Sequence, residues 1–166
     1  MNSRHPRPFG AGSALALVLG FLLAGCDYGV PLTAGPTRPV QAKLLGDWVE
    51  ITAEPERDRL GIRRLDDSTY IVVLNGDAYR AHHSDLGDEP FVSVQDLNDQ
   101  DRKYAWYRWS LSADGTQLTL EGVNSKLVPN EARDPAAAQR LLEAKRGAAG
   151  WLDEPARFVR SSREIR

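Results

Sequence analysis

Short apolar runs at strand period, separated by turn-forming residues, fill the middle of this 166-residue chain. The clearest run, 69–74, is β-branched and aromatic throughout and is followed by Asn75-Gly76. Both turn residues tolerate the positive φ of a type I′ turn, so this run and its successor, 77–84, are predicted to form a tight β-hairpin. Further strands are predicted over residues 46–51, 60–65, 91–95, 103–111 and 117–123.

Strands of this length, at a spacing of roughly 8–12 residues, indicate an antiparallel meander that closes into a small barrel or stacks as a sandwich. The chain is therefore predicted to be mainly β, with one C-terminal helix. Asp134-Pro135 is an N-cap followed by proline at the first helical position, residues 136–146 favour a helix, and Gly147 ends it. Beyond the helix, Trp151-Leu152 and Phe158-Val159 are predicted either to dock on the sheet or to form one further strand.

The tripeptide Gly46-Asp47-Trp48, at the start of the meander, is similar to the Gly-x-Trp signature of lipocalin-like barrels. The resemblance implies an eight-stranded barrel in which this tryptophan closes one end, followed by a helix. The pattern departs from that family because only about seven strands are apparent between Leu44 and Val123. Another small barrel, a sandwich and an α+β arrangement remain the alternatives.

A second motif lies before the strands. Two arginines precede an uncharged apolar run, residues 11–23, which is too short to span roughly 30 Å of hydrocarbon as a helix. The run ends in Leu23-Ala24-Gly25-Cys26, and the whole arrangement resembles the signal peptide and lipobox of bacterial lipoproteins. The resemblance implies cleavage between Gly25 and Cys26, a thioether from the Cys26 sulfur to diacylglycerol, and acylation of the new amine.

Lipidation of Cys26 would fix the location of the protein. At about 0.8 kcal/mol per buried methylene, two or three acyl chains hold a protein firmly to a bilayer, so the membrane is the first predicted partner and the protein is predicted to face the periplasm. An ordinary secretory signal is the alternative, but it would leave the only cysteine without a disulfide partner. Asp27 resembles an inner-membrane retention signal of enterobacterial lipoproteins, and the choice between inner and outer membrane stays open.

Three regions follow from these assignments. Residues 1–25 are the predicted signal peptide, residues 26–42 the lipidated cysteine with a proline-rich tether, and residues 43–166 the folded domain with its helix and a basic tail. The tether prediction depends on three prolines among small residues, which favour a semi-extended chain that holds the domain roughly 20–45 Å from the membrane. An N-terminal arm packed on the domain is the alternative. The tail, residues 157–166, carries four arginines.

Composition and motifs argue against several functions. The chain has 21 Lys and Arg against 23 Asp and Glu, and removing residues 1–25 takes away two arginines and no acid, which leaves a net charge of −4. A nucleic-acid-binding protein would need clustered basic residues, so none is predicted. The sequence contains no Gly-x-Ser-x-Gly elbow and no glycine-rich phosphate loop, and its one thiol is assigned to the lipid. Neither an enzyme nor a cofactor is predicted.

Metal ligands occur together only at His82-His83, which precede Asp85, Asp88 and Glu89. Adjacent residues of a strand point to opposite faces, so both histidines cannot easily bind one ion, and no metal site is predicted. The acidic run 96–101 lacks the glycine and glutamate of a calcium loop and is predicted to be a solvated loop.

Four aromatic residues, Tyr104, Trp106, Tyr107 and Trp109, are the candidate binding residues. Strand alternation puts Tyr107 and Trp109 on one face with the other two opposite. They are predicted either to pack across strands or under the helix, or to form an exposed or cavity-lining patch. The predicted function is a lipid-anchored envelope protein whose β domain binds a partner as an accessory or assembly factor. A carrier of a small apolar ligand is the alternative, and a hydrolytic enzyme is a third.

Overall fold

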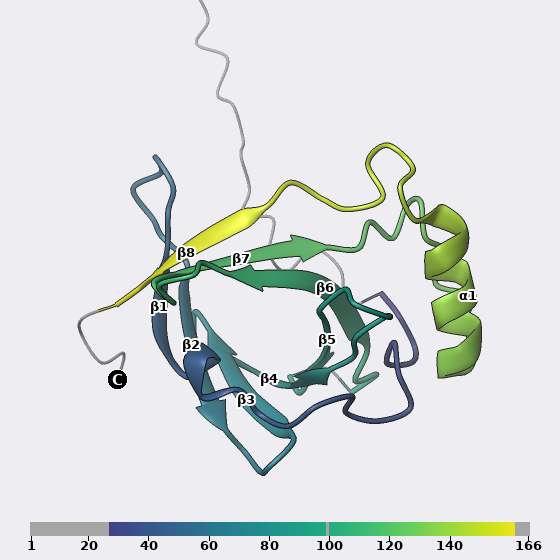
Figure 1. Cartoon of the computed structure of the whole chain (residues 1–166), viewed down its shortest axis with the longest axis horizontal. Helices are drawn as coiled ribbons and strands as arrows, with labels where there is room; N and C mark the ends of the chain where they lie inside the picture. Colours follow the sequence, from purple (N-terminus) through teal and green to yellow (C-terminus); the bar gives the residue numbers. More distant parts are fainter. Residues whose placement is uncertain (1–26, 99, 162–166) are drawn as a thin grey trace, which may run out of the picture.

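The described part of the chain, residues 27–98 and 100–161, forms a closed antiparallel barrel in a computed structural model (Figure 1). Consecutive strands are neighbours around the whole ring. The prediction of a mainly β, lipocalin-like meander with one C-terminal helix is confirmed, and the sheet closes as a barrel rather than stacking as a sandwich. The strands are β1 (Gly46–Glu50), β2 (Arg59–Arg64), β3 (Thr69–Leu74), β4 (Asp77–His83), β5 (Phe91–Asp96), β6 (Tyr104–Leu111), β7 (Gln117–Gly122) and β8 (Ala156–Arg160).

The strand that closes the barrel comes from the C-terminal part of the chain. In β8, Val159 pairs with Val49 of β1, and Phe158 pairs with Leu118 of β7. Closure satisfies the backbone groups of β1 and β7, which would otherwise be exposed sheet edges. Residues 157–160 of the predicted basic tail therefore belong to the barrel, and residues 162–166 lie outside the described part of the chain.

The β3–β4 hairpin forms as predicted. Asn75 has φ 53° and Gly76 has φ 105°, so both central residues of the turn are in the positive-φ region. A type I′ turn needs this geometry because its twist matches that of the flanking strands. The turn sets the register in which Leu74 lies opposite Asp77.

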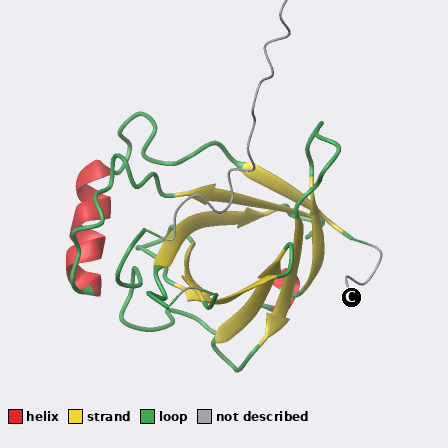
Figure 2. Ribbon diagram, turned by 180° about the vertical axis from the view of Figure 1, so that it is seen from behind, coloured by secondary structure: helices red, strands yellow, loops and turns green. Residues whose placement is uncertain are grey.

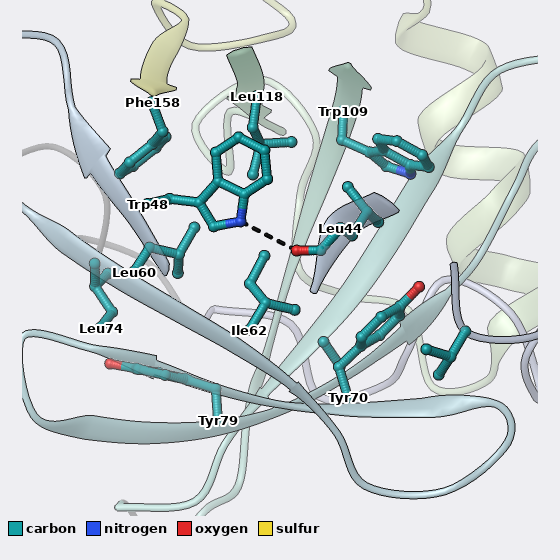
Figure 3. Close-up of a cluster of buried hydrophobic side chains, with 12 residues drawn as sticks. Leu44, Trp48, Leu60, Ile62, Tyr70, Leu74, Tyr79, Trp109, Leu118 and Phe158 are labelled. Atoms are coloured by element: carbon teal, nitrogen blue, oxygen red, sulfur yellow. Dashed lines mark hydrogen bonds between the residues drawn. The ribbon is translucent and has the colours of Figure 1, made fainter. Parts of the chain in front are cut away.

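The barrel interior is filled by an apolar cluster, the barrel core (Figure 3). At its centre the Trp48 ring is fully buried, and its Nε1–H donates to the carbonyl oxygen of Leu44, 3.0 Å away. Leu44 ends the short 3-10 helix η1 (Ala42–Leu44), and the Arg160 guanidinium lies 4.4 Å from the Trp48 ring centroid. The buried members of the barrel core are Val40, Leu44, Trp48, Leu60, Ile62, Tyr70, Leu74, Tyr79, Ala81, Trp109, Leu118 and Phe158.

Residues 27–41, here named the N-terminal arm, lie against the barrel, so the prediction of a free tether over residues 26–42 is wrong for the described residues 27–42. Tyr28 is 1% exposed and Leu32 is fully buried. The backbone N–H of Leu32 donates to the Ser93 hydroxyl of β5 at 2.9 Å. The segment has few large apolar side chains, which favoured a tether, but two of them bury enough apolar surface to hold the segment on the barrel. Cys26 lies outside the described residues.

The helix α1 (Pro135–Lys145) begins at the predicted N-cap, where the Asp134 carboxylate accepts a hydrogen bond from the backbone N–H of Ala137 at 2.8 Å. Its apolar side chains pack on the outside of the barrel, opposite β1 and β2 (Figures 1 and 2). None of the helices in the described ranges is long and apolar enough to cross a membrane. Together with the arm, α1 covers a second cluster, the outer core, formed by Tyr28, Leu32, Leu86, Phe91, Trp106, Val123, Val128, Ala132, Ala138 and Leu142.

Candidate functional site

The four aromatic residues of β6 are divided between the two cores. Tyr107 and Trp109 line the barrel interior, as strand alternation predicted. On the outer face, the Trp106 ring is 1% exposed because the Tyr28 ring stacks on it, with centroids 3.6 Å apart and planes 10° apart. Tyr104 exchanges two backbone hydrogen bonds with Tyr28, at 2.7 and 3.0 Å. The four side chains therefore form no common exposed patch; the N-terminal arm covers two of them.

The barrel interior contains an apolar cavity of about 90 Å³, lined by side chains such as Ile62, Val94, Tyr107 and Leu120. Pockets for small organic ligands typically measure roughly 300–1,000 Å³. The cavity is small because side chains of the barrel core, such as Leu60, Tyr79 and Phe158, project into the interior around it. The interior space is therefore several-fold smaller than a typical pocket for a small organic ligand.

The His83 side chain lies inside the barrel wall and is fully buried. Tyr70 Oη accepts a hydrogen bond from the backbone N–H of Gln41, so its own proton is directed to His83 Nε2, 2.7 Å away. The imidazole proton then sits on Nδ1, which has no hydrogen-bond partner within the described ranges. Burial, with the Arg38 charge adding to it, lowers the pKa of His83 to about 4, so this ring is neutral at pH 7.

His82, by contrast, points outward, as expected for neighbouring residues of one strand. Its Nε2 is buried and has no hydrogen-bond partner among the residues that the structure describes. Burial lowers the pKa of His82, and the nearby Arg80 charge lowers it further. Across residues 27–98 and 100–161, no group of three His, Cys, Asp or Glu side chains is placed to hold a metal ion. The two histidines thus belong to separate environments.

A polar groove of about 270 Å³ lies on the outer wall, between the N-terminal arm and the sheet. Its floor includes Arg80, Gln95 and Tyr104, which lie side by side because Arg80 pairs with Gln95 and Gln95 pairs with Tyr104. Residues 31–36 of the arm form one wall, and residues 66–69 of the β2–β3 turn form the other. The groove therefore exists only because the arm is docked.

The two charged side chains that line the groove, Asp66 and Arg80, differ in their hydrogen bonding. The Asp66 carboxylate accepts a hydrogen bond from the Thr69 hydroxyl, which contributes most to lowering its pKa to about 2. The backbone N–H groups of Ser68 and Thr69, both at 2.8 Å, lower the pKa further. Arg80 is exposed and makes no ion pair or hydrogen bond within the described part of the chain. Because a guanidinium carries five N–H donors, the groove offers a free cationic donor to a carboxylate or carbonyl group.

Hydroxyl groups of three residues, Thr33, Ser84 and Ser93, help to hold the arm on the barrel. The sequence alone did not predict this role. Ser84 and Ser93 are fully buried and their hydroxyls are 2.8 Å apart, and the Thr33 hydroxyl lies 2.9 Å from that of Ser84. Such buried hydroxyls need partners, and here they satisfy one another and the arm backbone. The alternation of Arg80 and His82 along strand 77–83 indicates a polar outer face, but only the strand register shows which residues lie beside them.

Fold and site together define a class: a small up-and-down β-barrel with a filled interior, a docked N-terminal arm and a polar groove on its outer wall. Compared with models of protein families, with curated proteins and with solved structures, the chain gives no match. Its function is therefore argued from its own residues.

Proposed function

We propose that this protein is a bacterial lipoprotein, anchored to a cell-envelope membrane through acyl chains on Cys26 and facing the periplasm, whose barrel acts by binding a partner as an accessory or assembly factor. The motif Leu23-Ala24-Gly25-Cys26 supports the anchor. The observation that carries partner binding is the filled barrel: a cavity of about 90 Å³ is too small for a typical carried ligand. Binding must then use the outer surface.

The polar groove is the proposed partner site. Arg80 supplies an unpaired positive charge, and His82 Nε2 supplies a buried polar atom without a partner in the described residues. The Asp66 carboxylate is engaged by its own turn, so it competes little for Arg80. These features suit a partner segment that presents a carboxylate or several carbonyl oxygens, which would form charge-assisted hydrogen bonds with the guanidinium.

Two measurements on protein purified with its native anchor test the proposal. Mass spectrometry of the mature chain is expected to show Cys26 as the first residue with diacylglycerol attached, and Cys26→Ser is expected to release the protein from membranes. A mature chain that begins elsewhere with a free thiol would contradict the anchor.

Partner binding is tested by comparing what co-purifies with the wild type, with Arg80→Ala combined with His82→Ala, and with Arg57→Ala. Arg57 is exposed on the β1–β2 loop, away from the groove, and serves as the matched arginine control. We expect a partner that is retained by the control and lost by the groove variant. Equal retention by all three proteins would remove the groove from the proposal.

A carrier of a small apolar ligand is the second candidate, and the apolar lining of the interior cavity favours it. Mass spectrometry of small molecules bound to the Cys26→Ser protein distinguishes the two functions. An apolar molecule recovered in a one-to-one ratio from the Cys26→Ser protein, which has no acyl chains of its own, would favour the carrier. An empty barrel would favour partner binding.

A further inference from the structure

The N-terminal arm begins at a defined point on the barrel surface. The Asp27 carboxylate accepts a hydrogen bond from the Ser125 hydroxyl at 2.6 Å. The next residue, Tyr28, donates its hydroxyl proton to the carbonyl oxygen of Val128 at 3.2 Å and pairs with Tyr104 through its backbone. Two successive residues are therefore held by two separate parts of the folded domain, the 124–128 loop and the start of β6.

The arm is held firmly enough to keep this geometry. The Tyr28 ring is stacked on Trp106, the Trp106 Nε1–H donates to the carbonyl oxygen of Val30 at 3.2 Å, and the buried Leu32 follows. Gln139 of α1 adds a hydrogen bond from its side-chain N–H to the Leu32 carbonyl oxygen at 3.0 Å. Releasing residue 27 from the surface requires breaking these contacts together.

Cys26 directly precedes Asp27, and successive Cα atoms are about 3.8 Å apart. We infer, on the basis of the proposed lipid anchor, that the barrel is not held away from the membrane but lies on the phospholipid headgroups. The surface that meets them surrounds Asp27. This anchor face consists of Lys103, Tyr104, Ser125, Lys126 and Leu127.

The chemistry of the anchor face suits a phospholipid surface. Lys126 is exposed beside Leu127, which is 39% exposed, and the Lys103 side chain, 44% exposed, lies 3.5 Å from the Asp101 carboxylate. Lys126 beside an exposed leucine suits the boundary between phospholipid headgroups and acyl chains, whereas Lys103 shares its charge with Asp101. Tyr104 also lines the polar groove, so the groove opens close to the bilayer, and a partner bound there would be met at the membrane surface.

The inference is tested by fluorescence quenching with the acylated mature protein, which begins at Cys26, in vesicles of phosphatidylcholine and phosphatidylglycerol. Cys26 is the only native cysteine, and its sulfur is consumed by the lipid, so an introduced cysteine takes up a single fluorophore. Leu127→Cys places the fluorophore on the anchor face. Ala113→Cys places it in the exposed β6–β7 turn, beyond the far end of the eight-residue strand β6, about 25 Å from Tyr104.

With quencher groups on the lipid headgroups, we expect at least several-fold stronger quenching at position 127 than at position 113. Equal quenching, or stronger quenching at position 113, would overturn the orientation while leaving the anchor intact. Mass spectrometry of the same sample keeps the two questions apart, because a Cys26 without lipid would overturn the proposed function instead.

Discussion

The barrel core and the outer core are built from the same kinds of side chain but by different means. In the barrel core, residues such as Trp48 and Leu118 come from a ring of hydrogen-bonded strands, each placed inward by strand alternation. In the outer core, Tyr28, Trp106 and Leu142 come from an arm, a strand and a helix. The first core is surrounded by the closed ring of strands, whereas the second covers only one wall of the barrel. The barrel core therefore stabilises the fold, whereas the outer core shapes the surface of the molecule.

The groove and the start of the N-terminal arm, on which the proposals depend, both belong to the outer core. The interior leaves about 90 Å³, while the docked arm creates a groove of about 270 Å³ and fixes Asp27 beside Ser125. On the opposite wall, apolar side chains such as Val73 and Val159, each 37% exposed, are not covered by any segment that the structure describes. Changes to the barrel core should therefore affect the whole fold, and changes to the outer core should affect the arm, the groove and the proposed membrane contact.

The largest effect is expected for Trp48→Ala, which removes the centre of the barrel core. Loss of a buried tryptophan typically costs about 3–5 kcal/mol, because the cavity adds to the lost burial. Urea unfolding followed by circular dichroism measures the change, with Val73→Ala as an exposed apolar control. A stability equal to that of the control would show that the barrel does not depend on this ring.

Acid is expected to act on the barrel core through His83. Its pKa is about 4 in the folded protein and near 6.5 when exposed, so the unfolded state binds the proton more readily. Stability should therefore hold above pH 6.5 and fall as the pH drops toward 4, by up to about 3 kcal/mol. We expect His83→Gln to flatten this part of the urea midpoint–pH curve, and His82→Gln to flatten it less, because the pKa of His82 is also lowered in the folded protein. A slope unchanged by His83→Gln would assign it to other groups.

A somewhat smaller effect is expected for Tyr28→Ala in the outer core. It removes the stack on Trp106 and the burial of one aromatic ring, a loss of about 2–3 kcal/mol. The arm should become sensitive to protease before the barrel unfolds. Tyr28→Phe keeps the ring and loses only the hydrogen bond to Val128, so it should cost about 1 kcal/mol. Equal losses for both variants would mean that the stack contributes nothing.

The smallest effect on stability is expected for Arg80→Ala, in the groove. The side chain is exposed and makes no ion pair or hydrogen bond within the described residues, so the change should stay within about 0.5 kcal/mol. Thermal unfolding measures it. A large loss of stability would make Arg80 part of the outer core rather than a free binding group.

The sequence by itself determined the local elements: the Asn75-Gly76 hairpin, the Asp134 cap of α1 and the alternation along β6. These depend on neighbouring residues and backbone preferences, which are written in adjacent positions of the chain. The lipobox at Cys26 lies outside the described residues and stays a prediction.

Tertiary structure alone decided that residues 156–160 close the barrel, that residues 27–41 dock instead of extending, and that Arg80, Gln95 and Tyr104 share one groove. Each of these features depends on contacts between residues that are far apart in the chain, such as Tyr28 and Trp106. Composition averages over a segment, but docking depends on whether a few large side chains find a complementary surface. That surface exists only once the strands have paired, which is why the tether and the arm could not be distinguished beforehand.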